Sequence, residues 1–454
     1  MKLYNTLTKQ VEEITPIIDK KINMFVCGPT VYDLSHIGHA KTYIQMDVLA
    51  RTLRSQGFKV FYLQNITDID DKIILKANET KASWEEISSK FESEYYKDME
   101  VLNNTSVDSY EKATDNIDTI KKQVQTLLDK KFAYVLEEDG IYFEIGKFKE
   151  YGKLSKRTEI AENDAQSRID QSDKKRGWND FCLWKFSKKG EPVWSADFGE
   201  GRPGWHIEDT AISENVFGPQ YDIHGGAVDL IFPHHEAEIT QMEAASGKSP
   251  FVRYWIHSGF LNIDGSRMGK SKDNFVTIQE VLEKGYSPMT VRLLMLQSHY
   301  RSSLDFSWDI LDAAHNSYKK LSAWADLQFQ NFKSPRLAKD YISDLEAVEN
   351  AMRNDLKTPE ALVILYKMIK KIDEEGAQPD SDAIAKAVQL IDSYFGLCLS
   401  NSSDISSGLK TIIGKRDEAR REKNWAESDR LREELVRKGI NIKDADYGTA
   451  WSRI

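Results

Sequence analysis

The N-terminal part of the chain alternates between apolar runs and a helical pattern. The segment "NMFVCG" predicts a short buried strand that ends at Gly28. From His36 to about Gln56, apolar residues recur at helical spacing, and Gly57 ends this predicted helix. The segment "KVFYLQNIT" predicts a second strand. A strand, a helix and a strand in this order are typical of a βαβ unit, so the pattern predicts a parallel sheet.

The pattern changes several times further along the chain. Residues from about 83 to 131 show helical spacing, whereas residues from about 132 to 205 are irregular and rich in Gly, Lys and Asp. Helical spacing returns from about 309 to 398. The segment "SNSSDISSG" at 400–408 has the composition of a linker. A charged helix, "KRDEARREKNWAESDRLREELVRKG", and a short tail are predicted to follow it.

Composition narrows the class of protein. No apolar run approaches the roughly 20 residues of a membrane span, and the N-terminal "MKLYNTLTKQ" lacks the apolar core of a signal peptide. The three cysteines, Cys27, Cys182 and Cys398, lie far apart, which excludes a disulfide framework and fits a reducing cytosol. The net charge of -10 argues against unselective nucleic-acid binding but permits a local basic face. We therefore expect a cytoplasmic protein without a membrane segment.

Two histidines follow the first predicted strand. His36 and His39 are spaced i, i+3 and share one face of the first helical turn. A helix N-terminus favours anions, and two imidazoles there can donate hydrogen bonds to phosphate oxygens and to charge that develops in a transition state. Gly38 leaves room for a flat base or ribose. Taken alone, this spacing favours two surface histidines that cap a helix.

A lysine-bearing loop, "RMGKSKDNF", lies at residues 267–275. Lys270 is surrounded there by small polar residues and glycine, and a mobile lysine can reach a polyphosphate as a point charge. Taken alone, the segment favours a solvated basic loop.

Considered together, the two segments resemble the signature motifs of class I aminoacyl-tRNA synthetases, H-I-G-H after the first strand and a late M-x-K-S loop. Over nearly its whole length the chain is similar to the cysteinyl-tRNA synthetase family. The similarity is carried by the segments "YNTLTKQVEE", "CGPTVYDLSHIGHA", "NITDIDDKII", "GRPGWHIE", "DIHGG", "DLIFPHHEAEITQ", "SGFLNIDGSRMGKS" and "HYRSSLDFS". It extends to the C-terminus, where "ARREKNWAESDRLREEL" and "GTAW" resemble the anticodon-binding end of that family.

This resemblance assigns a role to each part of the predicted α/β fold. It implies a Rossmann-like, parallel-sheet catalytic domain over 1–308, with an insertion at about 95–204 and a lysine-loop and stem-contact region at about 260–308. A helical bundle that binds tRNA would follow over 309–399. Residues 400–454 would form a linker and a small C-terminal anticodon-binding segment.

The resemblance also implies an activity. An ATP-dependent cysteine–tRNA ligase activates L-cysteine with ATP and Mg²⁺ to cysteinyl-adenylate and transfers the cysteinyl group to the 3′ end of tRNA(Cys). In this chain the implied catalytic residues are His36, His39 and Lys270. The residues implied to bind ATP are Thr30, His36, Gly38, His39, Gly225, Gly226, Asp229, Met268 and Lys270. Those implied to bind cysteine are Cys27, Gly28, Thr67, Trp205 and His224.

Two further properties follow from the resemblance. The family expectation for the oligomeric state is a monomer. Trp425 or Trp451 would be available to stack on bases of the tRNA, with basic side chains for its phosphates.

A metal site is implied as well. In the family, one zinc ion at the floor of the amino-acid pocket is held by two cysteines, a histidine and a glutamate. Cys27, His234 and Glu238 match three of these positions, and the i, i+4 spacing of the last two suits a metal-binding pair. The second cysteine is replaced by Asp209. A carboxylate is an accepted zinc ligand with the same charge as a thiolate, but it is harder, so metal selectivity could drift towards other divalent ions. In the alternative interpretation Asp209 does not bind and the site is empty or weak.

Other departures from the family pattern leave the activity open to two alternatives. The lysine loop carries Arg267 and Gly269 where the family has lysine and serine, and Ala227 replaces a glycine. A related ligase joins activated cysteine to an amino sugar in thiol biosynthesis, but it resembles only the catalytic part, so the C-terminal segment favours tRNA. A degenerate paralogue that binds RNA or nucleotide without catalysis would explain Asp209 but not the retention of His36, His39, Lys270, His234 and Glu238.

Overall fold

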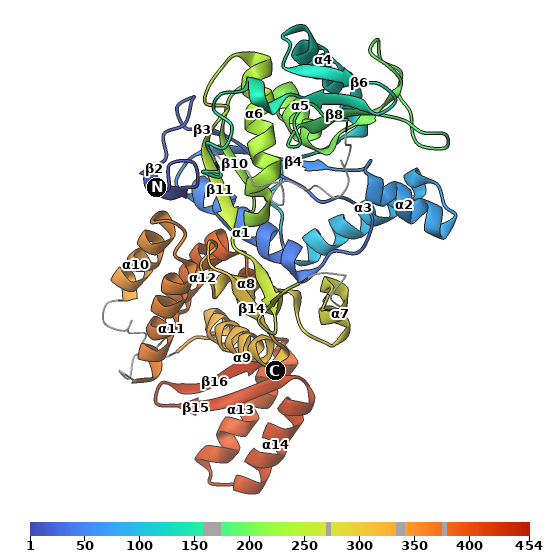
Figure 1. The fold of residues 1–454 in the computed structure, drawn as a ribbon. Coiled ribbons are helices and arrows are strands. Elements are labelled where there is room, and N and C mark those ends of the chain that lie inside the picture. The colour runs from blue at the N-terminus through green and yellow to red at the C-terminus, as the bar shows by residue number, and fades with distance from the viewer. Residues whose placement is uncertain (158–173, 269–273, 333–340, 375–378) are drawn as a thin grey trace. The chain divides into compact units, whose positions relative to one another are not determined.

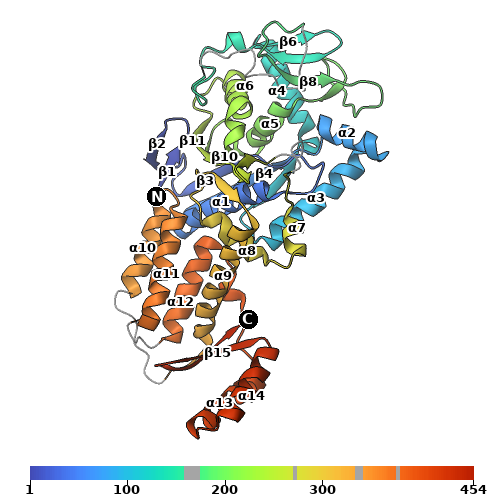
Figure 2. The ribbon, with the colours of Figure 1, turned by 60° about the horizontal axis from the view of Figure 1, so that its bottom comes forward.

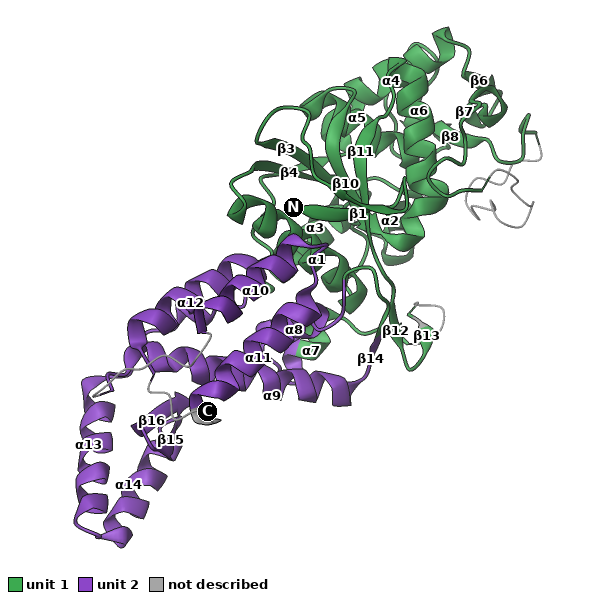
Figure 3. Cartoon of the chain, turned by 90° about the vertical axis from the view of Figure 1, so that its left-hand side faces the viewer, with its two compact units in different colours: residues 1–281, 300–304 green, residues 282–299, 305–454 purple. Residues whose placement is uncertain are grey.

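The computed structural model describes residues 1–157, 174–268, 274–332, 341–374 and 379–454 (Figure 1). These residues form two compact units, one of residues 1–281 and 300–304 and the other of residues 282–299 and 305–454 (Figure 3). Within the described ranges, no helix is both long and apolar enough to cross a membrane.

A five-stranded sheet is the centre of the first unit. Its strands are, in spatial order, β11 (Val252–Ser258), β10 (Tyr221–Ala227), β3 (Lys21–Val26), β4 (Lys59–Ile66) and β5 (Ser109–Lys112). Every neighbouring pair is parallel, which confirms the predicted parallel sheet. Helix α1 (Ile37–Ser55) connects β3 to β4, and β10 lies on the other side of β3. The strand order therefore reverses between β3 and β10, which is where open α/β sheets bind their ligands.

The predicted helical stretch at 83–131 is wrong in its middle. It contains α3 (Trp84–Val101) and α4 (Ile117–Asp129), but residues between them form β5. The carboxylate of Asp108 accepts a hydrogen bond from the Tyr62 backbone N–H at 2.7 Å and aligns the strand with β4. This tertiary pairing overrides the local pattern, which carries no strand signal.

The irregular stretch folds into a small sheet of its own (Figure 1, teal to green). Four strands pair in the order β6 (Ala133–Leu136), β7 (Gly140–Phe143), β8 (Phe181–Phe186) and β9 (Gly201–Pro203). All three pairings are antiparallel. The apolar face of α4 packs on this sheet together with residues of α5 (Trp205–Phe217) and α6 (Glu236–Ser246). Because α5 and α6 also line the main sheet, this packing fixes the helices that carry the site residues.

Shorter elements complete the first unit. They are β1 (Lys2–Asn5), β2 (Gln10–Glu13), α2 (Asp71–Thr80), β12 (Leu261–Ile263), β13 (Ser266–Arg267), β14 (Leu304–Phe306), α7 (Ile278–Glu283), three short 3-10 turns (Thr114–Asn116, Ile145–Lys147 and Val228–Leu230) and a π-type turn at Ile231–His235. Elements α7 and β14 extend into the residues of the second unit.

The second unit is mainly helical. Its elements are α8 (Pro288–Leu296), α9 (Trp308–Ala325), a 3-10 turn at Asp326–Phe329, α10 (Tyr341–Arg353), α11 (Thr358–Glu374), α12 (Ser381–Phe395), a 3-10 turn at Leu399–Asn401, α13 (Ser407–Arg421), α14 (Trp425–Arg437), β15 (Ile440–Ala445) and β16 (Gly448–Arg453). Helices α9 to α12 lie alongside one another (Figure 2).

The C-terminal segment differs from its prediction in two ways. The single charged helix is two helices, because Lys423 has a positive φ of 59° and Asn424 caps a new helix by accepting the Glu427 backbone N–H. The predicted tail is the antiparallel hairpin β15–β16. Trp451 in this hairpin is buried in an apolar cluster and stacks against Phe329, so it is not available for base stacking.

Candidate active site

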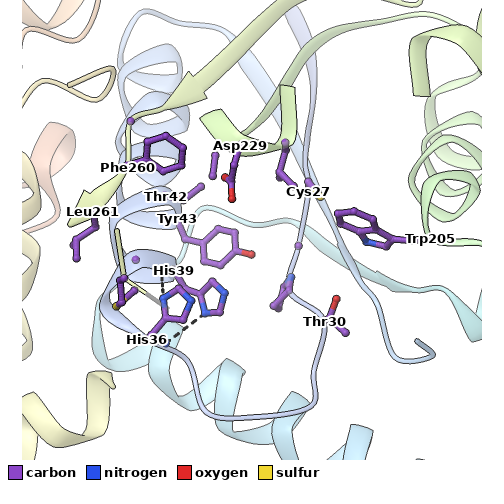
Figure 4. Close-up of a pocket in the computed structure, with 17 residues that line it drawn as sticks. Cys27, Thr30, His36, His39, Thr42, Tyr43, Trp205, Asp229, Phe260 and Leu261 are labelled. Atoms are coloured by element: carbon purple, nitrogen blue, oxygen red, sulfur yellow. Dashed lines mark hydrogen bonds between the residues drawn. The ribbon is translucent and has the colours of Figure 1, made fainter. Parts of the chain in front are cut away.

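A cavity of about 330 Å³ opens at the carboxyl ends of β3 and β10 (Figure 4). Its lining residues are Cys27, Gly28, Pro29, Thr30, His36, Gly38, His39, Thr42, Tyr43, Trp205, Ala227, Asp229, Leu230, Gly259, Phe260, Leu261 and Met268. The cavity therefore occupies the position that the reversal of strand order predicts for a ligand. In Figure 4 the paired imidazoles and Trp205 lie on opposite sides of it.

One end of the cavity is the N-terminus of α1. His36 is the N-cap residue, and its Nδ1 accepts the His39 backbone N–H at 3.2 Å, while His39 Nδ1 accepts the His36 backbone N–H at 3.4 Å. The two rings stack with centroids 3.7 Å apart. Because both Nδ1 atoms are acceptors, each neutral ring carries its proton on Nε2. The pair can thus present two N–H donors beside a helix N-terminus that already favours anions.

The described ends of the lysine loop lie against the start of α1. The Ile37 backbone N–H donates to Val276 O at 3.0 Å, and the Phe275 ring meets the His36 ring edge-on at 5.3 Å. On the other side, a Cβ added to Gly38 would lie 2.9 Å from Met268 Cε. Lys270, Gly269 and the serine that follows lie outside the described residues.

The other end of the cavity is backed by the four predicted metal ligands. Cys27 Sγ lies 3.6 Å from His234 Nε2, which in turn lies 3.2 Å from Asp209 Oδ2 and 3.1 Å from Glu238 Oε1. All four side chains are buried. Cys27 follows β3, Asp209 belongs to α5, and His234 lies in the turn directly before α6. Trp205 stacks on His234 with ring centroids 3.9 Å apart, and both Trp205 and Cys27 line the cavity.

The electrostatics of this cluster suit a cation. Burial, together with the nearby Asp209 carboxylate, raises the pKa of the Cys27 thiol and of Glu238 well above their usual values. Asp209 Oδ1 and both Glu238 carboxylate oxygens have no hydrogen-bond partner among the described residues. Ligand atoms of Cys27, Asp209 and His234 lie within 4.8 Å of one another. A divalent ion would satisfy these buried acceptors, and the sulfur, nitrogen and oxygen donors are of the types that zinc accepts.

A shell of further histidines surrounds the cluster. His206 Nδ1 lies 2.7 Å from His234 Nδ1, and His235 Nδ1 lies 2.8 Å from His257 Nε2. His224 Nε2 lies 3.5 Å from Glu238 Oε2, and its Nδ1 contacts Tyr221 Oη at 2.7 Å. His224 and His235 form a second group with Glu238 whose ligand atoms also lie within 4.8 Å of one another.

This shell consists of neutral imidazoles. Burial lowers the pKa of His206, His224 and His235 well below the usual value, and that of His257 to about 3. Sequence analysis did not single out His206, His235 or His257, although the segments "GWHIE" and "PHHEAE" contain the first two.

The remaining predicted residues fall into two classes. Thr30, Gly28, Trp205, Asp229 and Met268 line the cavity, whereas Thr67, His224, Gly225 and Gly226 are buried and are not among its lining residues. The two glycines belong to β10, and a Cβ there would lie 2.8 Å from Met46 Sδ or from the His235 ring. Lining residues that the sequence analysis missed are Pro29, Thr42, Tyr43, Leu230, Gly259, Phe260 and Leu261.

Comparisons with known proteins agree along the whole chain. Residues 13–316 match the family described as tRNA synthetases class I (C) catalytic domain, 347–399 match the DALR domain, and 402–451 match the cysteinyl-tRNA ligase anticodon binding domain. The cysteine–tRNA ligase of Thermoplasma acidophilum is 41% identical, over 99% of this chain and 100% of that protein. That of Caldicellulosiruptor saccharolyticus is 42% identical over 100% of both chains.

A solved structure shows the same fold. Mycobacterium tuberculosis methionyl-tRNA synthetase in complex with methionyl-adenylate matches with a TM-score of 0.63 over 84% of this chain and 92% of that chain, at 14% identity. One assignment accounts for these matches. The catalytic-domain family covers most of the sequence, and full-length relatives are about 40% identical. The chain belongs to the cysteine–tRNA ligase family of class I aminoacyl-tRNA synthetases.

Proposed function

We propose that this cavity activates L-cysteine with ATP and that the chain then transfers the cysteinyl group to the 3′ end of tRNA(Cys). The observation that carries the proposal is that the two ends of one cavity carry different chemical groups. A helix N-terminus with two imidazole donors faces one side, and a buried thiol backed by metal-type ligands faces the other. An adenylating enzyme needs this combination because an amino-acid carboxylate must meet the α-phosphate of ATP between them.

The first step is an in-line displacement. A carboxylate oxygen of cysteine attacks the α-phosphorus of Mg²⁺-bound ATP, a P–O bond forms, and the bond to the leaving pyrophosphate breaks. His36 and His39 donate their Nε2–H groups to the oxygens on which charge develops. Lys270 supplies a positive charge to the pyrophosphate, and the contacts of Met268 and Phe275 at the two ends of its loop support this role. The further ATP contacts are assigned to Thr30, Gly38, Gly225, Gly226 and Asp229.

The amino acid occupies the opposite end. Gly28, Thr67, Trp205 and His224 are assigned to its polar groups, and Cys27, Asp209, His234 and Glu238 would hold one zinc ion. When bound, the zinc supplies a soft Lewis acid that prefers a thiol to a hydroxyl. Such a preference is needed because an apolar pocket distinguishes isosteres by only about 1–3 kcal/mol. The buried carboxylate oxygens without partners support Asp209 as a ligand in place of the family's second cysteine.

The C-terminal segment would read the anticodon. Its match to the anticodon-binding family supports tRNA as the acceptor rather than an amino sugar. Trp425 is 55% exposed at the start of α14, and the Arg420 guanidinium lies 5.9 Å from its ring centroid. An exposed indole beside a cation suits stacking on an unpaired base. We assign this role to Trp425 alone, because Trp451 is buried.

Metal content and pyrophosphate exchange test the proposal together. Plasma mass spectrometry of the purified chain should find one zinc ion per chain, and ATP–pyrophosphate exchange should depend on cysteine and not on serine. Charging of a tRNA(Cys) transcript should follow. Exchange without tRNA charging, but with ligation to an amino sugar, would favour the related ligase. No exchange with either amino acid would favour the degenerate paralogue.

A further inference from the structure

A buried hydrogen-bond relay runs behind the wall of the cavity. The Gly28 backbone N–H donates to Asn65 Oδ1 at 2.5 Å, Asn65 Nδ2 donates to Thr67 Oγ1 at 3.4 Å, and Thr67 Oγ1 donates to Glu208 Oε2 at 3.0 Å. Asn65, Thr67 and Glu208 are each at most 1% exposed. The relay joins the ends of β3 and β4 to the first turns of α5, so it connects three elements that carry assigned site residues.

The first member of the relay fixes the orientation of the Asn65 amide. A backbone N–H can only donate, so the Asn65 atom facing Gly28 is the amide oxygen, and its NH₂ group faces Thr67. The Thr67 hydroxyl therefore accepts from Asn65 and donates a hydrogen bond to Glu208 Oε2. A hydroxyl has one donor and two acceptor positions, so one lone pair of Thr67 Oγ1 is left to accept a further hydrogen bond.

We propose that Glu208 is a positioning residue that fixes the Thr67 hydroxyl as an acceptor for the α-ammonium group of cysteine. The inference rests on the proposed function, which assigns Thr67 to the amino acid. Thr67 is close to the cavity wall, since its backbone N–H donates to Pro29 O at 3.1 Å and its carbonyl accepts from the Val31 N–H at 3.2 Å. Glu208 thereby selects amino acids over thiols that lack an amine.

The charge around Glu208 agrees with a cationic ligand. Glu208 accepts its hydrogen bond from Thr67, and among the described residues no lysine or arginine forms an ion pair with it. An ammonium group bound at Thr67 would be linked to the Glu208 carboxylate through the Thr67 hydroxyl, and the opposite charges would attract each other. Poor screening in the buried site strengthens this mutual effect.

The test compares two ligands that differ in one group. Cysteine carries the α-ammonium, whereas 3-mercaptopropionate has the thiol and the carboxylate without it. In Glu208→Gln, which removes the charge and leaves a weaker amide acceptor for the Thr67 hydroxyl, the KM for cysteine in pyrophosphate exchange should rise about tenfold or more. Inhibition by 3-mercaptopropionate should stay within about twofold of the wild type. Metal content should also be unchanged.

Variants of Thr67 extend the test. Thr67→Val should raise the KM as Glu208→Gln does, and Thr67→Ser should keep the wild-type KM. The double variant Glu208→Gln/Thr67→Val should lose no more than either single variant. Glu214→Gln, in the same helix, is the matched control. An unchanged KM in Glu208→Gln, or equal weakening of both ligands, would overturn the inference. Failure of the wild-type chain to activate cysteine would instead count against the proposed function.

Discussion

The two ends of the cavity are both built from histidine, but they differ in burial. His36 and His39 are half-buried and stacked at the start of α1, with both Nδ1 atoms bound to backbone N–H groups. Behind Cys27, the five side chains His206, His224, His234, His235 and His257 are at most 5% exposed. The same residue type is thus placed once beside solvent and once in a site that excludes it.

This difference shows that burial determines the protonation state of an imidazole and therefore what it can bind. In the buried shell, desolvation lowers the pKa of His206, His224, His235 and His257, so these rings stay neutral at physiological pH. Neutral rings can bind a metal ion or orient a ligand that does so. At the α1 end, the backbone instead fixes the tautomer, and the rings serve as N–H donors. One end is therefore suited to phosphate oxygens and the other to a metal ion.

The largest effect should come from the α1 end. His36→Asn keeps a good N-cap for α1 but removes the Nε2 donor. The rate constant of cysteine-dependent pyrophosphate exchange should fall about 10²–10³-fold, as for the loss of one transition-state donor, with little change in the KM for cysteine. Steady-state exchange assays measure both. Bound metal should be unchanged, and a rise in KM at constant kcat would show that His36 acts in binding only.

At the buried end, Asp209→Ala should weaken metal binding about 100-fold or more, since it leaves one ligand position empty. Chelator competition followed by plasma mass spectrometry measures the loss. Asp209→Cys, which restores the family ligand, should bind zinc at least as tightly as the wild type. Wild-type affinity in Asp209→Ala would show that Asp209 is not a ligand.

His206 supplies a further test of the buried end, because it contacts His234, the proposed ligand, rather than the proposed metal position. In His206→Gln the Nδ1 contact at 2.7 Å is lost, and metal affinity should fall about 10–100-fold. The same chelator competition applies. His315→Gln in the second unit is the control. If His206→Gln bound the metal as tightly as His315→Gln, His206 would not support metal binding.

Sequence analysis predicted the parallel sheet and the family correctly because both rest on local signals. The βαβ pattern around His36 and the family segments are continuous in sequence. It failed where long-range contacts decide the outcome. Strand β5 forms only because it pairs with β4, and the buried relay depends on Asn65 meeting Gly28 from a different strand. Lys270 stays a prediction, since it lies outside the described residues.

A last effect concerns the pH dependence of stability and follows from His257. Its pKa is lowered to about 3 in the folded chain, against about 6.5 when unfolded. Between these values only the unfolded chain binds the proton, so this group's contribution to stability is complete above about pH 6.5 and is lost as the pH falls towards 3. His257→Gln should therefore reduce the pH dependence of the unfolding free energy by about 1.4 kcal/mol per pH unit between pH 6 and 4. Urea unfolding of the metal-free protein at each pH measures this slope, with His315→Gln as the control. An unaltered slope in His257→Gln would mean that His257 is protonated in the folded chain. His257 would then not belong to the neutral buried shell that contrasts with the donor pair at α1.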